Sequence, residues 1–149
     1  MTDERILKAL APCGLSCERC YAYQGGPIVQ HATALKEAFG RFDVFAERFV
    51  KMGMPEFENW SQFKTLLDYI AAGDCRGCRI EPNCRPNCGV AECQKAGKMD
   101  FCYECTEFPC KKTNFDDHLE ARWITMNNRM KEIGPEAYYE ETKKQPRYK

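Results

Sequence analysis

The first clear pattern of apolar and polar positions follows the Gly-Gly-Pro sequence at 25–27. Apolar residues then recur in steps of four and three, which is the spacing of one face of an α-helix. They are Ile28, Ala32, Leu35, Phe39, Phe42, Ala46 and Phe49. The pattern predicts a long amphipathic helix over 28–49. Gly40 within it disfavours an unbroken rod, because glycine costs about 1 kcal/mol relative to alanine inside a helix.

A second helical pattern follows the turn at 53–55. Its apolar face consists of Trp60, Phe63, Leu67 and Ile70. Gly73 stands where a helix commonly ends. Aromatic residues at helical spacing are typical of a packed core. We therefore expect the aromatic residues of both patterns to stabilise helix packing, and not to contact a cofactor.

Three more helices are predicted in the second half of the chain. The first covers about 90–96 and ends at Gly97. The second can be capped by Asn114, Asp116 or Asp117. Its apolar face consists of Leu119, Trp123, Met126, Met130 and Ile133. Gly134 ends this helix, Pro135 can begin the third, and the basic residues 142–149 are expected to form a solvated chain end.

These patterns predict a mainly α fold. No alternation of apolar and polar residues is long enough to predict a β-strand. We expect a few packed helices around or beside an irregular cysteine-rich segment that is bound to metal. The length of 149 residues suits a single domain over 1–149.

The cysteine-rich segment covers 75–110 and holds eight of the eleven cysteines. They are Cys75, Cys78, Cys84, Cys88, Cys93, Cys102, Cys105 and Cys110. Apolar residues are few and scattered in this segment, so hydrophobic burial alone is a weak source of stability there. Tetrahedral thiolate sites can supply it, at roughly 10 to 16 kcal/mol of apparent binding energy per structural zinc.

The other three cysteines, Cys13, Cys17 and Cys20, lie in C-G-L-S-C-E-R-C. Their spacing lets three thiolates converge on one centre, and Gly14 can take backbone angles that a side chain resists. Three ligands leave the fourth position to another part of the chain.

Two C-x-x-C pairs, Cys75/Cys78 and Cys102/Cys105, are typical of zinc sites, and Gly77 eases the turn within the first. A tentative grouping joins these pairs in one site and brings Cys110 or a histidine to Cys13, Cys17 and Cys20. Three four-coordinate sites need twelve ligands. Either His31 or His118 completes the set, one centre keeps an open position, or two metals leave three thiols spare.

Charge and composition narrow the classes of function. The 22 basic and 22 acidic residues balance, which disfavours nucleic acid as a partner. No apolar stretch approaches the roughly 18 residues of a membrane span, and the first residues do not resemble a signal peptide. We expect a cytoplasmic protein, where clustered C-x-x-C pairs indicate metal or redox chemistry rather than disulfides.

Basic residues accompany the cysteines, and we expect them mainly to favour the ionised thiolates. They are Arg19, Arg76, Arg79, Arg85, Lys95, Lys98, Lys111 and Lys112. Acidic residues are interspersed among them, so a nucleic-acid patch is the weaker interpretation.

The ordered motifs resemble a known family. Five motifs, in this order, resemble those of the small cysteine-rich prokaryotic family named domain of unknown function 3795. They are C-G-L-S-C-E-R-C-Y-A-Y, C-R-G-C-R, the Cys84/Cys88/Cys93 group, F-C-Y-E-C-T-E-F-P-C and R-M-K-E-I-G-P-E-A-Y-Y-E-E. The resemblance covers Cys13 to about Glu141. All eleven cysteines match positions of that family, which makes each a candidate metal ligand. The resemblance implies a cytoplasmic metal-binding protein, generally presumed to bind zinc, with no established activity.

The C-x3-C-x2-C spacing is also similar to that of radical S-adenosylmethionine enzymes, which hold a [4Fe-4S] cluster with it. The chain is too short for their barrel, shows no alternation of strands and helices, and has Arg19 where those enzymes usually have an aromatic residue. The likeness supports iron and sulfur only as an alternative occupant, since thiolates suit zinc and iron clusters alike.

Three functions remain open from the sequence. The first is a zinc-binding protein with two or three mainly structural zinc sites that interacts with an unidentified protein partner. The second is an iron-sulfur protein for electron transfer or sensing. The third is an enzyme with an open three-cysteine metal centre. The sequence contains no H-E-x-x-H, nucleophile elbow or phosphate loop, which disfavours the third.

Overall fold

The computed structural model describes residues 2–82, 84–85, 87–97 and 99–149. These residues form helices and loops without a β-strand, which confirms the mainly α fold. The α-helices are α1 (Glu4–Ala9), α2 (Pro27–Phe39), α3 (Asp43–Lys51), α4 (Trp60–Ala71), α5 (Gly89–Lys95), α6 (Asp117–Ile133) and α7 (Pro135–Thr142). Two 3₁₀ helices cover Pro55–Asn59 and Cys102–Glu104. Helix α1 was not predicted from the sequence.

The chain forms two compact units. The cysteine unit combines Met1–Cys20 with Cys75–Lys149, and the helical unit is Tyr21–Asp74. All eleven cysteines belong to the cysteine unit. Whether the two units unfold together, as a single domain over 1–149 requires, stays a prediction. Among the described residues, no helix combines the length and the apolar character needed to cross a membrane.

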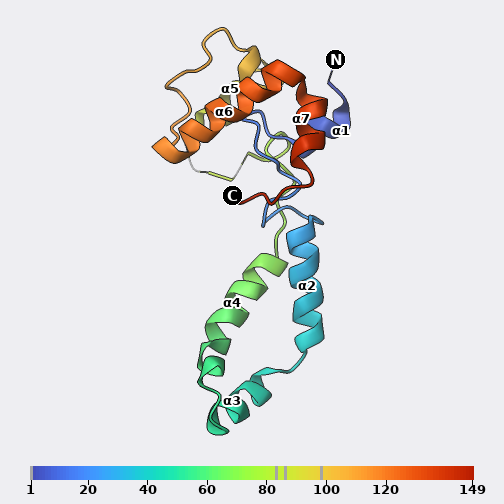
Figure 1. Ribbon diagram of the computed structural model, residues 1–149, viewed down its shortest axis with the longest axis vertical. Helices are drawn as coiled ribbons and strands as arrows, with labels where there is room; N and C mark the ends of the chain where they lie inside the picture. Colours follow the sequence, from blue (N-terminus) through green and yellow to red (C-terminus); the bar gives the residue numbers. More distant parts are fainter. Residues whose placement is uncertain (1, 83, 86, 98) are drawn as a thin grey trace. The chain divides into compact units, whose positions relative to one another are not determined.

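The helical unit is built on α2 and α4, which lie side by side (Figure 1). Helix α2 ends at Phe39, and the apolar pattern continues in α3, so the predicted helix over 28–49 is broken next to Gly40. Aromatic rings fill the space between these elements. The Phe42 ring centroid lies 4.6 Å from that of Trp60 and 5.7 Å from that of Phe57. Ring packing therefore holds the unit together, as the sequence predicted.

The hydrophobic core of the cysteine unit consists of two clusters, and both include residues of α6. Trp123 is 1% exposed, and Met130 and Phe101 are fully buried. Tyr138 and Tyr139 of α7 and Ile6 of α1 complete one side of this core. Phe101 lies within the cysteine-rich segment, so burial there depends on helices outside the segment.

Buried polar groups connect the loops to this core. Asn127 of α6 is fully buried and accepts a hydrogen bond from the Tyr103 backbone N–H at 3.1 Å. Its amide also donates to the Cys13 carbonyl oxygen at 2.9 Å. Arg79 donates to the backbone carbonyls of Leu7 and Asp100 at 2.8 and 2.6 Å. These bonds fix the loops that carry cysteines.

The end of the chain packs differently from the prediction of a solvated terminus. Arg122 of α6 donates to the Arg147 carbonyl oxygen at 2.8 Å, and Arg19 donates to the Gln145 carbonyl oxygen. Residues 142–149 are therefore attached to the cysteine unit through backbone acceptors, which a count of charged residues does not reveal.

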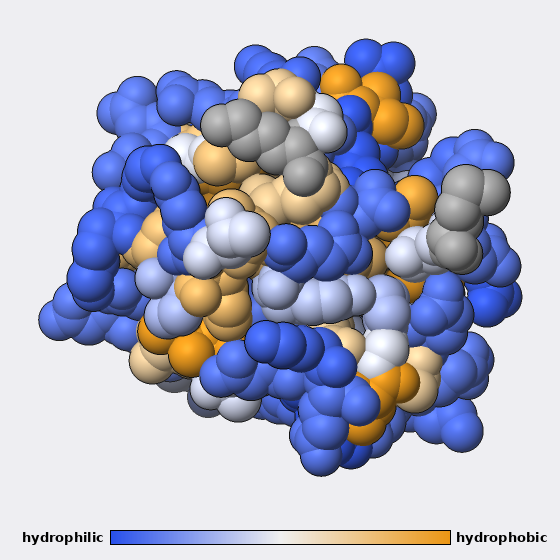
Figure 2. Space-filling model, turned by 90° about the horizontal axis from the view of Figure 1, so that it is seen from above, coloured by the Kyte–Doolittle hydropathy of each residue, from blue (hydrophilic) through white to orange (hydrophobic). Residues whose placement is uncertain are grey.

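Figure 2 shows hydrophobic areas separated by hydrophilic side chains on the face seen from above.

Candidate metal centre

The eleven cysteines line two cavities in the cysteine unit. Seven of them line the larger cavity: Cys13, Cys17, Cys20, Cys75, Cys78, Cys84 and Cys88. Four line the smaller: Cys93, Cys102, Cys105 and Cys110. We call these the seven-cysteine cavity and the four-cysteine cavity. Their free volumes are about 50 and about 20 Å³. No cysteine forms a disulfide within the described part of the chain.

The four-cysteine cavity lies between α5, the 3₁₀ helix Cys102–Glu104 and the loop before α6. Burial, together with the neighbouring Cys110, Cys93 and Cys105, raises the pKa of Cys102 to about 12. The Trp123 indole N–H opposes this effect and favours the thiolate of Cys102. The indole nitrogen is buried, and no acceptor among the described residues lies in the position of a regular hydrogen bond. The sulfur of an ionised Cys102 would provide its acceptor.

Two tight turns present sulfurs to the seven-cysteine cavity. Gly14 and Gly77 have positive φ angles of 89° and 96°, as predicted for these two turns. The Gly77 backbone N–H donates to the Cys75 sulfur at 3.4 Å. Burial raises the pKa of Cys13, and a hydrogen bond from the Leu15 backbone partly offsets it. Backbone N–H groups two residues after a cysteine thus stabilise negative charge on sulfur in both turns.

Cys78 and Cys84 form a pair within this cavity. The Cys78 thiol donates to the Cys84 sulfur, which raises the pKa of Cys78 and lowers that of Cys84. The guanidinium groups of Arg147 and Arg85 also favour the Cys84 thiolate. Arg85 was expected from its place beside a cysteine. Arg147 was missed because it follows Cys110 by 37 residues and no motif connects it to a cysteine.

Several other basic residues near cysteines also bind oxygen acceptors. Arg79 donates to backbone carbonyls, as described above. Three others form ion pairs: Arg76 with Glu81, Lys111 with Glu120 and Lys112 with Glu107. Lys98 lies outside the described residues. Cys17 and Cys78 still act on the charge of Arg79, and Cys93 and Cys110 act on that of Lys112. Charge compensation at sulfur is therefore shared by these two residues with Arg85 and Arg147.

The tentative grouping of the cysteines was wrong. Cys75 and Cys78 line the seven-cysteine cavity, whereas Cys102 and Cys105 line the four-cysteine cavity. Cys110 joins the latter pair and does not complete the group of Cys13, Cys17 and Cys20. Sequence separation misled the grouping because Cys93, within α5, lies near the Cys102 turn.

Neither histidine lines these cavities among the described residues. His118 is exposed on α6, and His31 is exposed on α2 in the helical unit. Besides the cysteines, Glu81 lines the seven-cysteine cavity and Glu107 lines the four-cysteine cavity, and both form ion pairs with basic residues. In the described part of the chain, no three His, Cys, Asp or Glu side chains already have the arrangement that holds a metal ion. The cysteines share cavities, while their sulfurs do not converge on one point.

The donors nevertheless fit a thiophilic metal. Thiolates suit zinc and iron, and both cavities combine thiols with N–H donors directed at sulfur. Four cysteines match the ligand number of one tetrahedral ion. A free volume of about 20 Å³ exceeds the roughly 10–15 Å³ that a water molecule needs, so the four-cysteine cavity has space for a single ion.

Comparison with known proteins gives a family without an assigned activity. A family model described as "Protein of unknown function (DUF3795)" matches residues 9–115. The matched range includes all eleven cysteines. No curated protein and no solved structure matches the chain. Since the model covers more than half of the chain, the resemblance stated above is confirmed, and the chain belongs to this family of small cysteine-rich proteins.

Proposed function

We propose that the chain is a zinc-binding protein whose metals stabilise the cysteine unit. The observation that carries the proposal is the division of all eleven cysteines between two cavities in one unit. Thiols packed together in a protein interior raise each other's pKa, as at Cys102. A divalent cation reverses this effect by favouring the thiolates, and its binding energy then adds to the free energy of folding.

The numbers of cysteines suggest three zinc ions. One ion in the four-cysteine cavity uses four thiolates. Two four-coordinate ions that share one bridging thiolate use seven, which is the number in the other cavity. This arrangement accounts for every cysteine and requires neither histidine. A shared thiolate lowers the number of ligands needed for three ions from twelve to eleven, which is the number of cysteines.

An iron-sulfur protein is the second candidate. The seven-cysteine cavity has apolar walls that include Val90, Phe115 and Leu119, and such surroundings suit a cluster that must exclude water. The small free volume of the four-cysteine cavity favours a single ion over a cluster there. An enzyme with an open metal centre comes third. We also expect a reducing compartment such as the cytoplasm, because free thiols have to persist.

Elemental analysis of anaerobically purified protein, with an assay of acid-labile sulfide on the same sample, tests the proposal. Three zinc ions per chain without sulfide are expected. Iron with matching sulfide would overturn the zinc proposal in favour of a cluster. Protein that contains neither metal and binds none when zinc is added would overturn both.

A matched pair of variants tests the division into two cavities. Cys110→Ser should remove the ion from the four-cysteine cavity and lower the zinc content by about one per chain. Cys20→Ser should leave that ion in place and affect only the seven-cysteine cavity. Cadmium-113 NMR of the substituted protein distinguishes the two losses, since each variant should remove a different resonance. Loss of the same resonance from both variants would contradict separate sites.

A further inference from the structure

A third cavity of the cysteine unit is lined by no cysteine. It has a volume of about 250 Å³ and lies among α6, α7, the loop after Ser16 and the final residues of the chain. Five basic side chains line it: Arg19, Arg122, Arg129, Arg147 and Lys149. Glu141 is the acidic residue of its lining. We call this cavity the arginine pocket.

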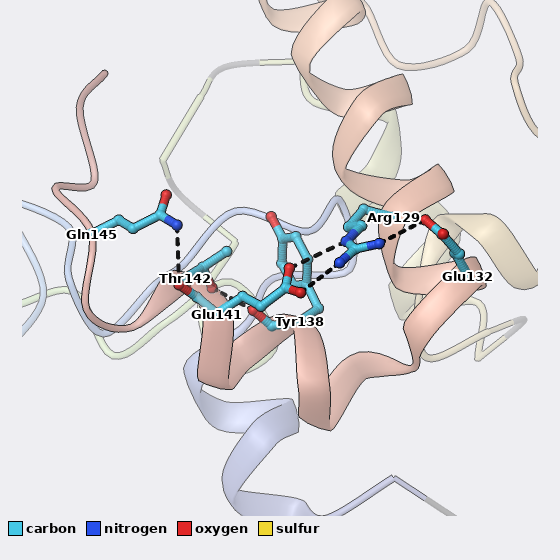
Figure 3. Close-up of polar contacts among 6 residues, drawn as sticks. All are labelled: Arg129, Glu132, Tyr138, Glu141, Thr142 and Gln145. Carbon is cyan, nitrogen blue, oxygen red and sulfur yellow. Dashed lines mark hydrogen bonds and ion pairs between the residues drawn. The ribbon is translucent and has the colours of Figure 1, made fainter.

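One of the five cations is already neutralised. Arg129 forms hydrogen bonds to Glu141, with 3.2 Å between Nε and Oε2, and to Glu132, with 2.8 Å between Nη1 and Oε2. Figure 3 shows the Arg129 guanidinium directed at both carboxylates, with Tyr138 and Thr142 of α7 next to them. The acidic residue of the lining is therefore occupied, and it does not balance the remaining cations.

The other cations bind neutral acceptors. Arg19 donates to the Ser16 hydroxyl at 3.1 Å, Arg122 donates to a backbone carbonyl, and Lys149 donates to the Gln145 side-chain oxygen. None of these three, nor Arg147, forms an ion pair with a carboxylate within the described ranges. Glu18 interacts with Arg19 only as a nearby charge. The positive charges of Arg19, Arg122 and Lys149 thus line the pocket without a bound counter-charge, while that of Arg147 also acts on the Cys84 sulfur.

Arg147 adds an independent observation. Its Nε atom is buried and has no hydrogen-bond partner among the described residues. A buried guanidinium N–H without an acceptor is costly, and such groups are normally satisfied by a protein atom, water or ligand. The guanidinium also lies over the Tyr148 ring, with 5.1 Å between its central carbon and the ring centroid. Arg147 lines the arginine pocket, so an anion bound there is one source of an acceptor.

We propose that the arginine pocket binds a small dianionic oxoanion of the phosphate type. Guanidinium groups reach it from α6, from the loop after Ser16 and from the chain end, and a tetrahedral anion offers acceptors in several directions. A carboxylate has only two oxygens and a single charge. The volume is below the roughly 300–1,000 Å³ of pockets for drug-sized ligands, which suits free phosphate or a small phosphate monoester. The proposed site includes no cysteine, and the pocket lies in the unit that the proposed metals stabilise.

The test is calorimetric titration of the metal-loaded full chain with inorganic phosphate, methyl phosphate and acetate at constant ionic strength. Saturable binding of phosphate with little binding of acetate is expected. Methyl phosphate that binds as tightly as phosphate identifies a monoester site, and exclusion of methyl phosphate identifies a site for the free anion. Equal binding of acetate, or no saturation by either phosphate in the millimolar range, would overturn the proposal.

Variants locate the binding in the pocket. Arg122→Gln should weaken phosphate binding about tenfold or more, because a charge-assisted hydrogen bond contributes roughly 1.5–3 kcal/mol. Arg41→Gln removes the same charge from an exposed position of the helical unit and should leave binding unchanged. Arg147 is unsuitable because it also lines the seven-cysteine cavity. Equal binding by the two variants would contradict the proposed site.

Folding and metal binding are checked on the same samples. Arg122→Gln should retain the metal content and tryptophan emission of the unmodified protein. If it does not fold, Lys149→Gln, at the chain end, takes its place and should also weaken phosphate binding. If metal-loaded protein does not bind phosphate, the proposed phosphate site is wrong and the proposed metal function is unaffected. If protein without zinc binds phosphate, the proposed metal function is wrong and the phosphate site stands.

Discussion

The interiors of the two units differ in what fills them. In the helical unit, aromatic rings of α2, α3 and α4 pack on one another, and no cysteine is present. In the cysteine unit, a buried tryptophan and phenylalanine share the interior with Cys13, Cys78 and Cys102. The α-helices have 9 to 13 residues in the helical unit and 6 to 17 in the cysteine unit. Isolated helices shorter than about 12–15 residues are marginal in water, so each unit needs another source of stability. The helical unit takes it from rings, and we expect the cysteine unit to take it from metal.

Metal removal is expected to give the largest difference in stability between the two units. The chain has one tryptophan in each, Trp123 in the cysteine unit and Trp60 in the helical unit. Trp60→Phe leaves Trp123 as the reporter, and Trp123→Phe leaves Trp60. A strong zinc chelator should shift Trp123 emission to the red as the cysteine unit unfolds, because roughly 10–16 kcal/mol of binding energy per ion is lost.

Trp60 emission is the internal control for that experiment. It should stay unchanged in chelator, since Trp60 packs on Phe42 and Phe39 at ring distances of 4.6 and 4.8 Å. Re-addition of zinc should restore the Trp123 emission. A simultaneous shift of both reporters would show that the two units unfold together, as a single domain does, and would end the proposed difference between them.

The next largest effect is expected at Asn127. Asn127→Ala removes an acceptor from the Tyr103 N–H and a donor from the Cys13 carbonyl, and leaves both backbone groups buried. A loss of about 3 kcal/mol in the unfolding free energy of the cysteine unit is expected. Chemical denaturation followed through Trp123 measures it. The exposed neighbour offers a control, and Asn128→Ala should change the free energy by less than about 0.5 kcal/mol.

A ring deletion tests the helical unit in the same way. Phe42 is half-buried and contacts Phe39, Phe49, Phe57 and Trp60. Phe42→Ala should cost the unit about 2 kcal/mol, below the roughly 3–5 kcal/mol of a fully buried phenylalanine. Denaturation followed through Trp60 measures it, with Phe45→Ala, at a ring that is 50% exposed, as the milder comparison. An unchanged midpoint for Phe42→Ala would show that the rings contribute little.

Sequence reasoning succeeded where local periodicity decides the structure. The apolar steps along 119–133, with a cap expected at Asn114, Asp116 or Asp117, predicted α6. Asp116 is the residue that accepts a hydrogen bond from the Leu119 N–H. Gly40 correctly indicated a break between α2 and α3. Gly14 and Gly77 correctly indicated tight turns. Each of these features depends on residues a few positions apart.

The grouping of cysteines failed because it depends on contacts between distant parts of the chain. Cys17 and Cys75 share a cavity although 58 residues separate them, and the whole helical unit is inserted between them. The spacing of a motif shows which cysteines can lie in one turn. It does not show which turns lie next to each other in the folded chain. The arginine pocket was missed for the same reason, since Arg19, Arg122 and Arg147 come from three separate segments.

The smallest expected effect concerns an ion-pair network on the helical unit. Asp68 of α4 lies 2.8 Å from the Lys64 Nζ atom and 2.9 Å from the Lys36 Nζ atom of α2. These lysines, Lys64 first, lower the pKa of the Asp68 carboxyl group. A lowered pKa in the folded state stabilises the fold above the usual value near 3.8, and this contribution is lost as pH falls through the lowered pKa.

Asp68→Asn should therefore lower the melting temperature of the helical unit slightly at neutral pH. The two proteins should converge in strong acid and in high salt, because protonation and screening both weaken the ion pairs. Glu37→Gln, at an exposed position of α2, controls for loss of one negative charge. A difference that persists in acid or in salt would assign the effect to packing of Asp68 and not to its charge. Metal should not alter this difference, because the network lies wholly within the unit that holds no cysteine.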